Sequence, residues 1–417
     1  MRKIILREKR KIPPFNEPAR DLSVLCKPLW LHQRDILVPY MTEELEVDSL
    51  SEIGHDRVET LVYRENLYFD QPFIDEFIVQ ARSLGKACQV AFELDDPAIS
   101  QHAIYLQRGI RRQGNVYVAD LWYYPYGIEP VVRPLVMHTE PREAGYYHVP
   151  THMSNVYGDL VYQLPTKAFL SIEHWIHILF ANVMFGIFSI GARFERSLEK
   201  DLGLNLRLLW QAMLERRQLL GSSALVQVGK NCQIDPTAII QGPTIIGNNV
   251  TIGAGAMIAN CVLGDNVNIA HGCQLLLSVL GDGTFLPFRA SLFETVLMED
   301  CMVAQNTCLQ MCVVGRETFI GAGNTFTDFN LVPTIPIRSH FGGRLENTGL
   351  SVIGSAVGHH VRIGSGMVIF PARMIESDVI LFASPERRVI DRNITYEDSD
   401  HWKLPNPEIA HPRLYPR

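Results

Sequence analysis

From residue 234 the chain reads Ile234-Asp-Pro-Thr-Ala-Ile, Ile240-Gln-Gly-Pro-Thr-Ile, Ile246-Gly-Asn-Asn-Val-Thr and Ile252-Gly-Ala-Gly-Ala-Met. The same six-residue frame resumes at Leu263, Ile269, Leu280, Leu286, Leu297, Val303, Val314 and Ile320, and again at Val357, Ile363 and Ile369. A period of six fits a triangular coil in which each flat side uses one hexapeptide and points one aliphatic side chain inward. The repeat therefore predicts an all-β left-handed parallel β-helix from about Val226 to Phe382.

The chain has 417 residues, which favours more than one domain. Residues 1–165 show an α/β pattern, with a strand at Val58–Tyr63, a helix at Phe73–Leu84 that ends at Gly85, and a strand at Ala87–Phe92. We expect an α/β domain at 1–165, a helical connector at 166–222 that includes a helix at Arg196–Leu220, the β-helix at 223–385, and a proline-rich extension with little helix or strand signal at 386–417.

One insertion interrupts the hexapeptide frame. Residues 327–350 carry Pro333, Pro336, Gly342 and Gly343, and an insertion in a solenoid projects as a loop from one corner. Two interpretations remain open for this loop: a solvated excursion, or a segment that reaches a neighbouring subunit or covers a ligand cleft.

Composition excludes several classes of function. The chain has 38 Lys and Arg against 45 Asp and Glu, so it lacks the basic surface of a nucleic-acid-binding protein. The basic N-terminus is not followed by the long apolar region of a secretory signal peptide. The apolar stretch Ile176–Ala192 is interrupted by His177 and Asn182. We expect no spanning segment, although residues 172–192 could contact a membrane peripherally. Eight cysteines without a CxxC pair indicate free thiols in a reducing cytoplasm.

Three segments of the repeat region carry a resemblance to a known family. They are Ile320-Gly-Ala-Gly-Asn-Thr-Phe-Thr-Asp-Phe-Asn330, Asn347-Thr-Gly-Leu350 and Ile353-Gly-Ser-Ala-Val-Gly-His-His-Val-Arg-Ile-Gly-Ser-Gly366. They resemble the late coils of the bifunctional N-acetylglucosamine-1-phosphate uridyltransferase/glucosamine-1-phosphate acetyltransferase family. This resemblance implies a Rossmann-like nucleotidyltransferase-type domain before the β-helix, a homotrimer with active sites between neighbouring columns, and a sugar phosphate or nucleotide sugar as substrate.

The first 182 residues show a partial resemblance to the same family. The segment Asp21-Leu-Ser-Val-Leu-Cys-Lys-Pro-Leu29 looks like its Lys-Pro-Leu element, which makes Lys27 a candidate phosphate-binding residue. The region Leu61–Asp70 resembles its central strand, where Glu65-Asn66 stands in place of the magnesium-binding Gly-Asp, and Glu65 is the candidate Mg²⁺ ligand. Trp175–Asn182 looks like its domain-closing helix. The Gly-rich phosphate loop has no counterpart in Leu6–Asn16, which argues against ordinary nucleotidyl transfer.

The resemblance to the family's acyltransferase domain implies a histidine that acts as general base. The corresponding stretch here, Cys308-Leu-Gln-Met-Cys312, contains no histidine. His271 and His340 are the candidate catalytic bases. The candidate substrate-binding residues are Asn330, Gly321, Gly323, His359 and His360. A γ-type carbonic anhydrase would need a His-x4-His pair, which the sequence lacks.

Two functions remain open. The first is a transferase of sugar-phosphate or nucleotide-sugar metabolism that uses an acyl-CoA-like donor at the β-helix. The second is a non-catalytic trimeric scaffold or regulatory binding protein of the same architecture.

Overall fold

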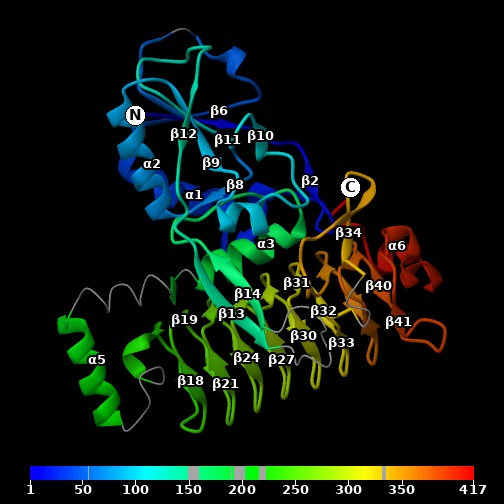
Figure 1. Ribbon diagram of the computed structural model, residues 1–417. Coiled ribbons are helices and arrows are strands. Elements are labelled where there is room, and N and C mark those ends of the chain that lie inside the picture. The colour runs from blue at the N-terminus through cyan, green and yellow to red at the C-terminus, as the bar shows by residue number, and fades with distance from the viewer. Residues whose placement is uncertain (55, 149–158, 189, 192–201, 216–221, 331–334) are drawn as a thin grey trace. The chain divides into compact units, whose positions relative to one another are not determined.

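The computed structural model describes the chain except for residue 55 and residues 149–158, 189, 192–201, 216–221 and 331–334 (Figure 1). The described residues form two compact units. The first contains Met1–Ile12, Glu17–Ala181 and Glu346–Gly349, and the second contains Pro13–Asn16, Asn182–Leu345 and Leu350–Arg417. The short segment Pro13–Asn16 therefore belongs to the second unit although it lies near the start of the chain.

A mixed sheet forms the centre of the first unit. Its strand order is β12-β9-β11-β7-β1-β6, and β10 also pairs with β11. Strand β1 is parallel to β6 and β7, whereas β11 is antiparallel to β7 and β9. The strands are β1 (Arg2–Leu6), β6 (Glu43–Val47), β7 (Thr60–Arg64), β9 (Cys88–Glu93), β10 (Arg111–Gln113), β11 (Val116–Tyr124) and β12 (Arg133–Val136).

The strand, helix and strand expected in residues 58–92 are present as β7, α2 (Gln71–Leu84) and β9. Helix α2 begins after Asp70, whose carboxylate accepts a hydrogen bond from the Phe73 N–H at 3.0 Å. It ends at Gly85, where φ is 62°, a conformation that glycine adopts without strain. The antiparallel strand β11 separates β7 from β9, an arrangement that the local pattern did not predict.

Further elements lie outside the central sheet of the first unit. They are β2 (Lys11–Ile12), β3 (Glu17–Pro18), β4 (Ser23–Val24), β5 (Lys27–Pro28), α1 (Leu29–Leu37), β8 (Leu67–Phe69), β13 (Arg142–His148), β14 (Asp159–Leu164), β15 (Phe169–Ser171) and α3 (Trp175–Asn182). Residues 166–181, expected in the connector, lie in the first unit, because β15 pairs with β8.

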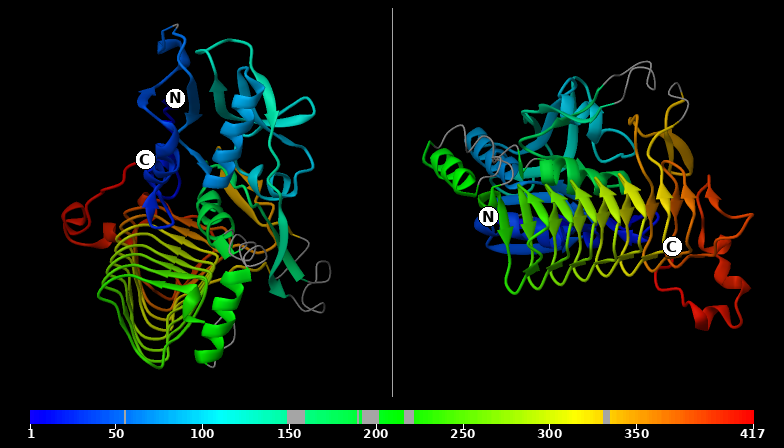
Figure 2. Two further views of the ribbon diagram at one scale, coloured as in Figure 1. Left: turned by 90° about the vertical axis from the view of Figure 1, so that its left-hand side faces the viewer. Right: turned by 90° about the horizontal axis from the view of Figure 1, so that it is seen from below.

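Among the described residues, the β-helix of the second unit consists of three parallel sheets of eight strands each. Figure 2 shows its coils stacked in a row. The first sheet contains β16 (Val226–Val228), β19 (Thr244–Ile246), β22 (Val262–Leu263), β25 (Val279–Leu280), β28 (Val296–Leu297), β31 (Val313–Val314), β36 (Ala356–Val357) and β39 (Met374–Ile375). The second contains β17 (Gln233–Ile234), β20 (Thr251–Ile252), β23 (Asn268–Ile269), β26 (Phe285–Leu286), β29 (Met302–Val303), β32 (Phe319–Ile320), β37 (Arg362–Ile363) and β40 (Ile380–Leu381). The third contains β18 (Ile239–Gln241), β21 (Met257–Ala259), β24 (Gln274–Leu276), β27 (Ser291–Phe293), β30 (Cys308–Gln310), β33 (Thr325–Phe326), β38 (Val368–Ile369) and β41 (Val389–Ile390).

One aliphatic column fills the interior, which confirms the predicted parallel β-helix. The frame residues from Ile246 to Ile369 are buried in a single core cluster. Val262 pairs with Val279 and Val279 with Val296, so a middle coil advances by 17 residues, which corresponds to two six-residue steps and one five-residue step. This shorter third side explains why the frame shifts by one residue per coil.

The insertion at 327–350 contains a two-stranded hairpin, β34 (Arg338–Phe341) and β35 (Arg344–Asn347). Pro333, which helps to break the repeat, lies outside the described residues. The hairpin is inserted between β33 and β36, and Phe329 pairs with Val352 where the chain leaves and rejoins the coil.

The remaining elements lie at the two ends of the β-helix sequence. The helix expected at Arg196–Leu220 is present as α5 (Leu202–Glu215), and both of its expected flanks lie outside the described residues. In the C-terminal extension, β41 completes the third sheet and α6 (Pro407–Ala410) follows it. Among the residues described here, no helix is long and apolar enough to cross a membrane.

Candidate functional site

A pocket in the late coils combines apolar walls with two arginines. Its volume is about 510 Å³. Its lining comprises Thr327, Phe329, Asn330, Ile335, Pro336, Ile337, Arg338, Leu345, Phe370, Pro371 and Arg373. We call it the late-coil pocket. The inserted hairpin supplies one wall and the segment after β38 supplies the other.

The two arginines give this pocket its electrostatic character. The Arg373 Nε–H donates to the Pro371 carbonyl at 3.0 Å, and burial lowers the pKa of its guanidinium from the usual value. Arg338 lies on β34 and is exposed. No carboxylate is among the lining residues, so the pocket offers positive charge beside apolar surface, which suits a phosphate or carboxylate attached to an apolar group.

Asn330 is the one predicted site residue that lines the late-coil pocket. Its side-chain amide donates to the Ile335 carbonyl at 3.1 Å. Gly321 is packed against the next coil, since a Cβ there would lie 2.8 Å from the Gly364 carbonyl carbon. Gly323 is an exposed corner residue with φ of 68°. Neither glycine lines the pocket.

The four candidate histidines lie in different environments. His271 and His340 are exposed, and His359 is fully buried, where its Nδ1 accepts a hydrogen bond from the Arg316 N–H at 2.8 Å. His360 pairs with Asp378 at 3.0 Å and stacks on His411. None of the four is in the lining of the late-coil pocket.

His340 nevertheless lies close to that pocket along the chain. Side chains on β34 alternate between exposed and buried, so Arg338 and His340 share the exposed face of the strand. His271 follows β23 in an early coil and has no such relation to the pocket. The geometry therefore favours His340 over His271 as the imidazole nearer a ligand bound by Arg338.

Asp328 is a buried acid that sequence reasoning missed. Its chain neighbours Thr327 and Phe329 line the late-coil pocket. The Gln310 amide, in the orientation that satisfies both of its atoms, donates to the two Asp328 carboxylate oxygens at 2.8 and 3.2 Å. Burial raises the pKa of Asp328 above its usual range. Asp328 belongs to the quoted segment that ends at Asn330, but a carboxylate in a loop is by sequence alone an ordinary surface residue.

A second, smaller cavity of about 380 Å³ runs along the third sheet, over β18, β21, β24, β27 and β30. We call it the sheet groove. Its outward-facing lining is apolar or uncharged, and consists of Ile239, Gln241, Met257, Ala259, Gln274, Leu276, Ser291, Phe293, Cys308 and Gln310. It contains no titratable group other than the Cys308 thiol, whose pKa is raised by burial.

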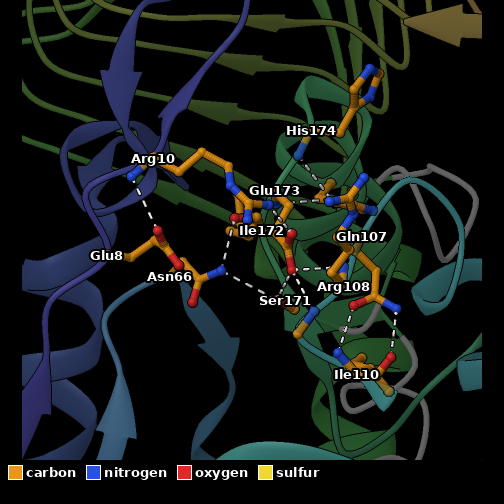
Figure 3. Close-up of polar contacts among 12 residues, drawn as sticks. Glu8, Arg10, Asn66, Gln107, Arg108, Ile110, Ser171, Ile172, Glu173 and His174 are labelled. Carbon is orange, nitrogen blue, oxygen red and sulfur yellow. Dashed lines mark hydrogen bonds and ion pairs between the residues drawn. The ribbon is translucent and has the colours of Figure 1, made fainter. Parts of the chain in front are cut away.

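In the first unit, polar contacts gather around Glu173, beside the segments that follow β1 and β7 (Figure 3). Glu173 accepts hydrogen bonds from the Arg108 and Gly109 amides at 2.9 and 2.6 Å and from Ser171 Oγ at 3.0 Å. Arg10 forms an ion pair with the same carboxylate. The loop after β1, where no Gly-rich sequence was found, is thus held by intramolecular contacts.

The predicted metal ligand Glu65 takes part in the same arrangement. It is buried, its carboxylate accepts from the Glu8 N–H at 2.8 Å, and it pairs with Arg20 at 2.7 Å. A cation would compete with Arg20 for these oxygens. The described residues hold no group of three or more His, Cys, Asp or Glu that could bind a metal ion. Lys27 is exposed and pairs with Asp35 at 2.8 Å.

Comparison with known proteins identifies the repeat. The family described as "Bacterial transferase hexapeptide (six repeats)" matches residues 226–260. This match supports the hexapeptide character of the first coils, and it covers a small part of the chain. No curated protein matches this chain.

Three solved structures show distant similarity. The UDP-N-acetylglucosamine acyltransferase from Campylobacter jejuni is 14% identical over 38% of this chain and 68% of its own, with a TM-score of 0.24. A putative acetyltransferase from Bacillus cereus is 16% identical over 42% and 86%, with a TM-score of 0.17. A polysialic acid O-acetyltransferase is 19% identical over 41% and 80%, with a TM-score of 0.16. At such scores, the similarities carry no argument about this chain.

Proposed function

We propose that this chain is a hexapeptide-repeat transferase whose late-coil pocket binds an anionic, partly apolar ligand of the acyl-CoA class. The matched hexapeptide family is a transferase family by its description, which supports group transfer as the type of reaction. The observation that carries the proposal is that one pocket combines two guanidinium groups, those of Arg338 and Arg373, with apolar walls.

An acyl-CoA donor combines the two kinds of surface that this pocket offers. Its phosphates would contact the guanidinium groups, which bind phosphate oxygens through paired N–H donors. Its acyl and pantetheine portions would lie against side chains such as Phe329 and Leu345. A nucleotide sugar also carries phosphates, but it has less apolar surface, so we place it as the acceptor.

In this proposal, an acceptor hydroxyl or amine attacks the thioester carbonyl, the carbon–sulfur bond breaks, and CoA leaves as its thiolate. A base must take the acceptor proton. Among the predicted bases, His340 is favoured by the face that it shares with Arg338, and His271 remains the alternative. We further propose a homotrimer, in which a neighbouring column would complete the acceptor site.

Calorimetric titration of the full chain with acetyl-CoA tests ligand binding. Arg373→Ala is expected to weaken binding by roughly 10-fold to 100-fold, because a charged hydrogen bond contributes about 1.5–3 kcal/mol. Arg344→Ala is the control, since Arg344 is an exposed arginine on the hairpin that carries Arg338 and is not among the lining residues. Equal loss in both variants, or no binding by the wild-type chain, would overturn the proposal.

Turnover is tested separately by release of free CoA thiol in the presence of sugar-phosphate and nucleotide-sugar acceptors. His340→Asn should lower kcat while leaving acetyl-CoA affinity within about twofold, as expected of a base that acts only during reaction. A loss of kcat in His271→Asn, together with an unchanged kcat in His340→Asn, would identify His271 as the base.

The second candidate function is a non-catalytic binding or scaffold protein, and the first unit favours it for that part of the chain. The carboxylates of Glu65 and Glu173 already hold Arg20 and Arg10. Nucleotidyl transfer needs free acidic groups for Mg²⁺ and free cations for phosphate. Binding of acetyl-CoA without measurable turnover against any acceptor would support this candidate over the transferase.

A further inference from the structure

Helix α5 exposes an uncharged apolar stripe. The exposed side chains include Leu206, Leu209, Trp210, Met213 and Leu214, which occupy positions i, i+3, i+4, i+7 and i+8 and so lie on one face of the helix. Leu206 and Leu214 are each 67% exposed, and Trp210 is 61% exposed. Five large apolar side chains in one row are costly to leave in water, so this stripe marks an interaction surface.

The sheet groove is a second apolar surface of the same unit. Ile239, Met257 and Leu276 are each at least 40% exposed along its floor. The five strands that it crosses are spaced about 4.8 Å apart, so the groove is about 19 Å long. Helix α5 has 14 residues and is about 21 Å long, which matches the groove.

We propose that α5 of one copy of this chain docks in the sheet groove of a second copy. Each copy supplies one helix and one groove, so the two surfaces occur in equal numbers. Within the second unit, the Gln211 side-chain amide donates to Ser223 Oγ at 3.0 Å, which holds α5 beside the chain entry to the first coil with its stripe exposed. The groove of a partner copy can then receive the stripe.

Charge favours a protein surface over a lipid surface as the occupant. Between Leu202 and Glu215 the helix carries one basic residue, Arg207, and one acidic residue, Glu215, so its net charge is zero. An interfacial membrane helix usually carries several Lys or Arg residues that attract anionic lipid. The groove is also uncharged, so neither surface opposes the contact. This inference is independent of the late-coil pocket and of any ligand there.

Sedimentation of the full chain over a range of concentrations tests self-association. Trp210→Glu on the helix and Leu276→Glu in the groove should each weaken it by roughly tenfold or more, as expected for a central apolar anchor. Val79→Glu is the matched control, because Val79 is 66% exposed on α2 of the first unit. A mixture of the Trp210→Glu and Leu276→Glu chains should associate, since one intact helix and one intact groove remain.

Disulfide trapping identifies the contact directly, because Cys308 is a free thiol in the groove. Met213→Cys, treated with diamide, should form a disulfide with Cys308 of another chain and give species of two or more chains on a non-reducing gel. Adding Cys308→Ser should abolish these species. A monomer at all concentrations, a disulfide confined to one chain, or vesicle binding through α5 without self-association would overturn the proposal.

Discussion

The side-chain amide of Asn16 donates a hydrogen bond to Glu376 Oε1 at 3.0 Å, across 360 positions of sequence. The same amide donates to the Tyr415 carbonyl at 3.0 Å. Beside it, the Ser377 hydroxyl donates to the Pro14 carbonyl at 3.0 Å. The segment Pro13–Asn16, a late coil and the C-terminal end are thereby joined inside the second unit.

Glu376 is the centre of this junction, and its removal should destabilise the second unit. Its carboxylate accepts from Asn16, from the Tyr396 N–H at 2.9 Å and from Arg417 at 2.7 Å. Glu376→Ala leaves these donors unsatisfied and is expected to lower the free energy of unfolding by about 2–4 kcal/mol, measured by urea denaturation.

Glu397→Ala serves as the control for Glu376→Ala. Glu397 also pairs with Arg417, at 2.8 Å, but its side chain is 61% exposed. The loss expected there is at most about 1 kcal/mol. Similar losses in the two variants would show that the buried junction contributes no more than a surface ion pair.

The aliphatic column predicts a large effect of truncating an interior residue. Ile320 is fully buried in the β-helix core, so Ile320→Ala should cost about 2–5 kcal/mol through lost burial and the cavity left behind. Val389→Ala is the comparison, since Val389 is exposed on β41, and it should change stability by about 0.5 kcal/mol or less. Denaturant midpoints measure both. An equal shift would contradict the assignment of Ile320 to the interior.

His411 should make stability fall in mild acid. Burial and the neighbouring His360, His401 and Arg362 lower the pKa of His411 from 6.5 to about 4, while Asp378 opposes this effect. As the pH falls from 6.5 to about 4, the unfolded chain takes up a proton that folded His411 does not, so stability present above pH 6.5 is lost. His411→Leu should therefore lose less stability than the wild-type chain between pH 7.5 and 5, measured by urea midpoints.

Asp328 should make the stability of the folded chain fall as the pH rises, the opposite of the effect of His411. Burial raises its pKa in the folded chain above 3.8, so the folded state keeps a proton that the unfolded state releases. The stability that Asp328 contributes is present below pH 3.8 and is lost as the pH rises through the pKa of Asp328 in the folded chain. Asp328→Asn, which keeps an oxygen for the Gln310 amide, should be more stable than the wild-type chain at pH 7. A less stable variant at pH 7 would contradict a raised pKa.

The β-helix could be predicted because its rule is local. An aliphatic residue such as Leu263 or Ile269 recurs at a fixed step, and each is buried in the core. The last strand of the third sheet was not predicted, since β41 contributes only Val389 and Ile390 and no repeat precedes them directly. A two-residue strand leaves no periodic signal of its own.

The candidate site could be predicted only in part. Asn330, one of the predicted substrate-binding residues, lines the late-coil pocket, but Arg338 and Arg373 carry no recognisable motif. They lie on an inserted hairpin and on a later coil, and only the folded insertion brings them to one pocket. The Arg10–Glu173 ion pair of the first unit likewise joins residues 163 positions apart. Contacts between distant segments depend on packing that a single sequence does not display.

The most direct test of the late-coil pocket is the structure of the full chain with CoA bound. We expect phosphate density within hydrogen-bond distance of the Arg338 and Arg373 guanidinium groups, with the pantetheine chain against Phe329 and Leu345. CoA bound elsewhere on the chain, with both guanidinium groups free of it, would contradict the proposed function.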